Sequence, residues 1–137
     1  MKARVRWNGK MGFVGISGTN HTVPMDVSPA VGGDGAAASP LEMVLMGLAG
    51  CSGADVVSIL RKKKIKIDDF QIFLEAERAA DHPKVFTKVD LRFVFRGDNL
   101  RLKPLEDSVR LSVEKYCSVA GMIEKTAQIE WKVEIED

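Results

Sequence analysis

The two cysteines are the side chains of this chain best suited to covalent chemistry. Cys51 lies between Gly50 and Ser52 in a long apolar segment, so small neighbours leave its sulfur accessible in a buried setting. Cys117 lies where a predicted helix ends and a turn begins. If Cys117 heads the next helical turn, free amides there would stabilise its thiolate. A free cysteine is also often a small buried hydrophobe, so the residues alone leave both interpretations open.

Metal and cofactor chemistry are not predicted. Two thiols cannot form a disulfide framework, and His21 and His82 lie at spacings that do not complete a zinc site. Both histidines are interpreted as turn or surface residues. The glycine-rich segment 28–38 is not followed by Lys-Ser or Lys-Thr, which disfavours a phosphate-binding loop. We therefore expect no metal and no cofactor.

Length and composition favour a single domain over residues 1–137. The chain has 20 basic and 19 acidic residues, a formal charge of +1 and 45% apolar residues. A chain of this length can bury a core without disulfides or metals, and its balanced charge predicts no basic surface for nucleic acid. The charged, alternating start predicts no signal peptide, and the polar residues within 41–60 disfavour a membrane span. We expect a cytoplasmic protein whose thiols are reduced at rest.

The first half of the chain predicts a meander, a loop and a long helix. Short alternating stretches with glycine turns indicate a β-meander over residues 1–27, and small residues over 28–38 indicate a mobile loop. Ser39, Pro40 and Glu42 form a helix-start signature, because serine and glutamate can cap each other's amides. The central helix, within 39–64, should run from about Pro40 to Lys63 and end in cations that suit its dipole.

This central helix is apolar on nearly every side, so protein must surround it. Its length of roughly 36 Å is more than one small chain can cover. We therefore expect a homodimer with a large apolar interface, in which two chains cover each other's helices.

The residue pattern of 65–137 predicts two strands, two helices and a last strand, in the order β-β-α-α-β. Two alternating segments, 70–77 and 85–95, are typical of an antiparallel strand pair joined by a turn. Leu105, Val109, Val113 and Tyr116 recur at helical spacing, a short helix should follow Cys117, and 129–136 alternates as a strand. The full order is β-β-β-α-β-β-α-α-β, an α+β fold.

Two motifs resemble those of the OsmC/Ohr family, the osmotically induced and organic hydroperoxide resistance proteins. The segment Pro40-Leu41-Glu42-Met43-Val44-Leu45-Met46-Gly47-Leu48-Ala49-Gly50-Cys51 is similar to the family's central-helix signature, and Tyr116-Cys117-Ser118-Val119 to its second cysteine motif. The resemblance implies an intertwined homodimer with antiparallel sheets around a buried cysteine helix. It also implies thiol peroxidase activity, with Cys51 as the peroxidatic nucleophile, Cys117 as the resolving thiol, and an external dithiol as reductant.

The chain departs from active members of the family near the expected site. Those members have a glutamate directly after the proline and an arginine from upstream, whereas here Leu41 follows Pro40. Nine residues at about 100° each place Glu42 on the face opposite Cys51, which favours a helix cap. No arginine occurs between Trp7 and Leu60. The cation could instead come from a second subunit or from one of three residues: Arg4, Arg6 or Lys115.

Asp55 lies one turn after Cys51, where an unpaired carboxylate would raise the thiol pKa. We interpret it as a buried group paired with an amide or a cation, and retain Asp55 and Glu42 as supporting candidates. These departures resemble the divergent YhfA-like members.

Three hypotheses follow. The first is a dimeric thiol-dependent peroxidase that reduces organic or small hydroperoxides in oxidative-stress defence. The second is a non-peroxidase protein of the same fold that binds a small apolar ligand in the dimer groove, lined by Cys51. The third is a structural dimer without a ligand.

Overall fold

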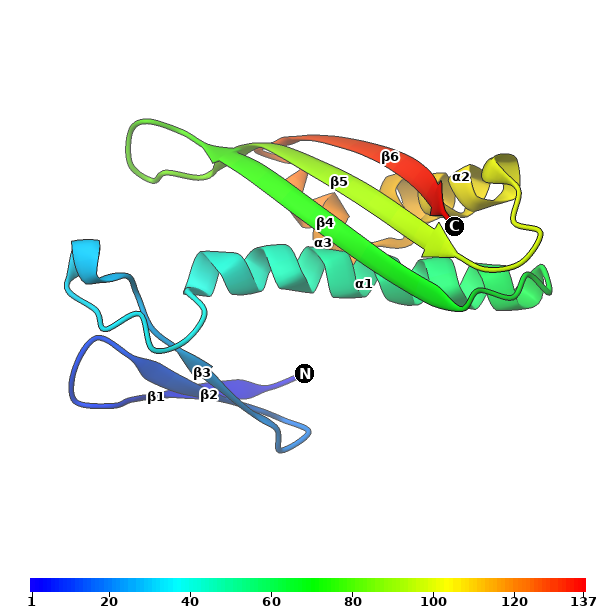
Figure 1. The fold of residues 1–137 in the computed structure, drawn as a ribbon. Helices are drawn as coiled ribbons and strands as arrows, with labels where there is room; N and C mark the ends of the chain where they lie inside the picture. The colour runs from blue at the N-terminus through cyan, green and yellow to red at the C-terminus, as the bar shows by residue number, and fades with distance from the viewer. The chain divides into compact units, whose positions relative to one another are not determined.

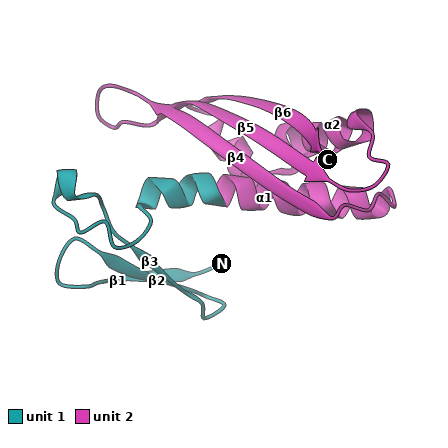
Figure 2. Cartoon of the chain, viewed as in Figure 1, with its two compact units in different colours: residues 1–46 teal, residues 47–137 magenta.

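The computed structural model describes residues 1–137 and confirms the predicted order of elements (Figure 1). It divides into two compact units, residues 1–46 and 47–137 (Figure 2). The elements are β1 (Ala3–Trp7), β2 (Phe13–Ser17), β3 (Thr22–Met25), a 3-10 turn η1 (Pro29–Val31), α1 (Pro40–Lys62), β4 (Asp69–Arg78), β5 (Phe86–Arg96), α2 (Leu102–Leu111), a π-helical turn η2 (Ser112–Tyr116), α3 (Ser118–Ile123) and β6 (Gln128–Glu136).

The first unit carries an antiparallel meander in the order β1-β2-β3. Side chains alternate between the two faces of a sheet, and the pairing register places one apolar set on a single face: Val5, Trp7, Phe13, Val23 and Met25. Four of these are 41–61% exposed, namely Val5, Trp7, Phe13 and Val23. One chain therefore leaves an apolar sheet face open to solvent.

Residues 28–38, which the composition predicts to be a mobile loop, are folded around the buried carboxylate of Asp26. This carboxylate accepts hydrogen bonds from three backbone amides, at 2.7 Å from Val27, 3.2 Å from Asp34 and 3.1 Å from Ala36. These bonds lower the pKa of Asp26, with the Ala36 amide contributing most. The loop thus has a defined hydrogen-bonded conformation, and its mobility stays a prediction.

Helix α1 begins with the predicted capping box. The Ser39 amide donates to Glu42 Oε1 at 2.9 Å, and the Glu42 amide donates to Ser39 Oγ at 3.2 Å. Only one stripe of the helix, with fourfold spacing, is buried: Leu48, Ser52, Val56 and Leu60. The helix is long and apolar enough to cross a membrane by length and composition, yet only 22% of its most apolar window is buried here. The complete burial expected for this helix is therefore not reached within one chain.

The second unit packs helices against one face of the sheet β4-β5-β6 (Figure 1). The predicted alternation is confirmed, because the inward residues of β5 belong to the core: Val89, Leu91, Phe93 and Phe95. The expectation of purely antiparallel sheets is wrong for β6, which pairs parallel to β5. Alternating hydrophobicity carries no strand direction, and the helical connection between β5 and β6 is long enough for the chain to cross over and return in the same direction.

The helix predicted to end at Tyr116 changes its geometry before that residue. Helix α2 ends at Leu111, and the next five residues form the π turn η2. Leu105 and Val109 are fully buried as predicted, whereas Tyr116 is 54% exposed. The wider turn rotates Tyr116 away from the apolar stripe.

Candidate functional site

Helix α1 presents Cys51 beside its buried stripe. The residue directly precedes the fully buried Ser52, and its own side chain is half-buried. A Cβ atom built on Gly47 or Gly50 would meet no atom within 4 Å apart from its chain neighbours and the backbone of its own helix. Open space therefore exists on the helix surface next to Cys51, as the small flanking residues predict.

The π turn ends at Cys117, which caps the short helix α3. Its Sγ accepts a hydrogen bond from the Ala120 amide at 3.4 Å and lies 4.0 Å from the Leu48 carbonyl oxygen, one turn before Cys51. Cys117 is only 4% exposed. The predicted position at the head of a helical turn is thus correct, and the structure brings Cys117 against the helix that carries Cys51.

Burial raises the pKa of the Cys117 thiol to about 11. The amides of Ala120 and Val119 favour the thiolate, as expected, but burial outweighs them, and interaction with the neighbouring Cys51 sulfur raises the pKa further. Two neighbouring thiolates in a buried site repel each other, which disfavours ionisation of the second thiol. Cys117 therefore keeps its proton at neutral pH, while Cys51 is the less buried sulfur of the pair.

Alkylation of Cys117 should consequently rise steeply with pH. In a Cys51→Ser protein the burial that contributes most to the shift remains, so the iodoacetamide rate should increase about tenfold per pH unit from pH 7 to at least pH 9. The measurement is mass spectrometry of the alkylated peptide across pH. A rate that levels off near pH 8.5, as for an exposed thiol, would contradict this assignment.

Glu42 acts as a helix cap in this structure. Hydrogen bonds from Ser39 lower the pKa of its carboxyl, with the backbone amide contributing most. The same bonds hold the carboxylate at the start of α1, as its spacing from Cys51 predicts. Glu42 therefore caps the start of α1, and a catalytic role for it stays a prediction.

Asp55 has a partner that the sequence did not predict. Its Oδ2 accepts a hydrogen bond from Ser112 Oγ at 3.1 Å, and the same hydroxyl lies 3.0 Å from both Ser52 Oγ and the Ser52 carbonyl oxygen. The carboxylate is therefore paired, as expected, but with a hydroxyl rather than an amide or a cation. Ser52 and Ser112 were missed as site residues, although serines at positions where helical periodicity calls for apolar residues were a usable signal.

No lysine or arginine of the second unit donates a hydrogen bond to either sulfur. The candidate cation Lys115 instead places its Nζ 5.2 Å from the centre of the Tyr116 ring. Arg4 and Arg6 belong to exposed β1 in the first unit.

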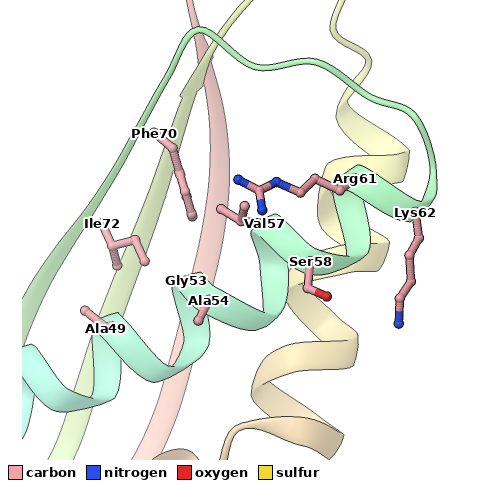
Figure 3. Close-up of a pocket in the computed structure, with 10 residues that line it drawn as sticks. Ala49, Gly53, Ala54, Val57, Ser58, Arg61, Lys62, Phe70 and Ile72 are labelled. Carbon is pink, nitrogen blue, oxygen red and sulfur yellow. The ribbon is translucent and has the colours of Figure 1, made fainter. Parts of the chain in front are cut away.

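An apolar groove of about 930 Å³ runs between α1 and β4 (Figure 3). Small residues of α1 form its floor, Phe70 and Ile72 of β4 form one wall, and Arg61 and Lys62 lie toward one end. Gly50 contributes to the lining, but neither Cys51 nor Cys117 does. Within one chain, neither sulfur therefore lines the groove.

Comparison with known proteins identifies relatives along the whole chain. The OsmC-like protein family matches residues 33–132. The protein YhfA of Escherichia coli strain K12 is 42% identical over 135 residues, which cover 98% of each chain. The crystal structure of a hypothetical protein from Aquifex aeolicus VF5 is 30% identical, with a TM-score of 0.82 over 99% of this chain and 97% of that one.

A more distant structure shares the fold. It is an organic hydroperoxide resistance protein OsmC from Legionella pneumophila, 19% identical with a TM-score of 0.72, and the match covers 99% of this chain and 96% of that one. The family match, the near full-length relatives and the shared fold agree with the resemblance of the two cysteine motifs. The chain therefore belongs to the OsmC-like protein family.

Proposed function

We propose that this protein is a thiol-dependent peroxidase that reduces organic or small hydroperoxides in oxidative-stress defence. The observation that carries the proposal is the position of Cys117, whose Sγ lies 4.0 Å from the Leu48 carbonyl oxygen, one turn before Cys51, in a chain of the OsmC-like family. The fold shared with an organic hydroperoxide resistance protein of Legionella pneumophila supports a role with hydroperoxides.

The reaction divides between the two sulfurs according to their surroundings. Cys51 is less buried and borders open space, so its thiolate attacks one peroxide oxygen, forms a sulfenic acid and releases an alcohol or water. Cys117 then attacks the Cys51 sulfur. A disulfide forms, and the sulfenic oxygen leaves as water with the proton of Cys117. Two electrons from an external dithiol return both cysteines to thiols.

The functional form in this proposal is a homodimer. The exposed apolar face of the meander and the uncovered sides of α1 support it, because exposed apolar patches of this kind mark association surfaces. A second chain could also supply the cation that is absent from the thiol pair in the second unit. We place the protein in the cytoplasm, where a dithiol reductant is available.

Peroxide consumption tests the proposal directly. The purified protein is mixed with cumene hydroperoxide or hydrogen peroxide in the presence of dithiothreitol or dihydrolipoamide, and the remaining peroxide is measured over time. We expect many turnovers per chain with at least one peroxide and one dithiol. Consumption no faster than in the Cys51→Ser protein would refute the proposal.

The groove along α1 favours a second candidate, an OsmC-like protein that binds a small apolar ligand. Its floor and walls are mainly apolar, and cations lie at one end. Saturable binding of a fatty acid to a dimer that consumes no peroxide would support this alternative. The absence of both cysteines from the groove lining in one chain disfavours the version in which Cys51 contacts the ligand.

A further inference from the structure

Ser112 connects the two segments that carry the cysteines. Its side-chain oxygen lies 3.0 Å from the Ser52 carbonyl oxygen and 3.1 Å from Asp55 Oδ2, both within the turn of α1 that follows Cys51. Its backbone carbonyl accepts the amide hydrogen of Cys117 at 2.8 Å. One residue is thus hydrogen-bonded both to the Cys51 helix and to Cys117 itself.

The Ser112 hydroxyl lies at the centre of this network. The Ser112 hydroxyl has one proton to donate toward the Asp55 carboxylate or the Ser52 carbonyl, and the Ser52 hydroxyl, 3.0 Å away, can donate to Ser112 Oγ in return. Ser52 and Ser112 are completely buried. Water cannot replace a lost bond in such a site without rearrangement, so each bond constrains the positions of the two segments strongly.

The π turn gives Ser112 a direct influence on the Cys117 sulfur. The turn begins at Ser112 and is closed by the amide of Cys117, five residues later. A π turn contains one more residue than an α-helical turn, and each residue of an α-helix rotates the chain by about 100° around the axis. The extra residue therefore changes the direction in which Cys117 points. Wide turns of this kind cost stability and are frequent at functional sites. The side-chain bonds of Ser112 fix the start of this turn against α1.

We propose that Ser112 and Asp55 are positioning residues that hold the Cys117 sulfur against Cys51 and thereby stabilise the disulfide between them. The inference rests on the thiol pair of the proposed function, but it concerns only the closure of the disulfide. Neither residue touches the peroxide. The polar network therefore has a redox role in addition to any contribution to folding.

Equilibration with glutathione tests this role without peroxide. Oxidised glutathione takes two electrons from Cys51 and Cys117, which form the disulfide, and is released as two reduced glutathione molecules. In Ser112→Ala the equilibrium constant should shift at least about tenfold toward the dithiol, because the two thiols lose the bonds that hold them in position for disulfide closure. Asp55→Ala should shift it in the same direction, whereas Asp55→Asn should stay near wild type, since its amide oxygen still accepts from Ser112.

Ser108→Ala is the matched control. Ser108 is an equally buried serine of the preceding turn, and its hydroxyl contacts Pro104 and Lys63 rather than the Cys51 turn. Thermal melting of each reduced variant reports folding, and Asp55→Ala, at a half-buried site, serves as the second variant if Ser112→Ala does not fold.

Three results would each overturn the inference. The first is a glutathione equilibrium constant within twofold of wild type in Ser112→Ala or Asp55→Ala, and the second is an equal shift of that constant in Ser108→Ala. The third is a wild-type protein that forms no disulfide. Disulfide formation that depends on Ser112 in a protein without peroxide turnover would overturn only the proposed function.

Discussion

Replacing Cys51 with serine should lower peroxide consumption at least about a thousandfold, because a serine hydroxyl stays protonated at neutral pH and cannot be oxidised by a peroxide. The rate is measured from peroxide loss in the presence of a dithiol. Serine differs from cysteine by one atom, and the site borders open space, so the fold should be retained. A Cys51→Ser protein that retains the wild-type rate would show that another group performs the chemistry.

The Cys117→Ser protein is the matched control for this result. Without an added reductant it should consume about one equivalent of peroxide per chain and hold Cys51 as a sulfenic acid, which a dimedone probe traps. The wild-type protein should show little trapped sulfenic acid, since the neighbouring Cys117 thiol removes it. Equal trapping in both proteins would contradict the resolving role of Cys117.

A charge on the apolar face of the meander should dissociate the proposed dimer. Val23 is 44% exposed in one chain and shares its sheet face with Val5 and Trp7. If a second chain covers this face, Val23→Glu buries an unpaired carboxylate in each protomer, and the dissociation constant should rise at least about a hundredfold. Sedimentation velocity across protein concentrations measures this change.

The adjacent substitution Thr22→Glu separates this effect from a general effect of charge. Thr22 belongs to the same strand but to the opposite face of the sheet. It should therefore leave the dissociation constant close to that of the wild type. A wild-type protein that stays monomeric, or two variants that weaken association equally, would contradict the proposed interface.

Patterns that depend on local chemistry predicted the fold well. The capping box of Ser39 and Glu42 locates the start of α1, and strict alternation identifies β4, β5 and β6. The parallel direction of β6 was missed because alternation is the same in both directions. The π turn before Cys117 was missed because one extra residue hardly changes a helical pattern over so short a segment.

The candidate site could be predicted only in part. Cys117 lies against the helix that carries Cys51, the catalytic roles that the resemblance implies for both cysteines stay predictions, and Glu42 is a cap, as its spacing from Cys51 predicts. The partner of Asp55 was beyond prediction, since Ser112 lies 57 positions away in the sequence and reaches α1 only through tertiary packing. The raised pKa of Cys117 was also unexpected, because its cause is burial, which depends on the complete fold.

Mass spectrometry of the unreduced protein after one equivalent of peroxide tests whether Cys51 and Cys117 react as a pair. We expect the peptides containing Cys51 and Cys117 to be linked by a disulfide within one chain, and a dithiol to reverse the link fully. Unlinked cysteines, or Cys51 oxidised irreversibly to the sulfinic acid while Cys117 stays free, would contradict this expectation.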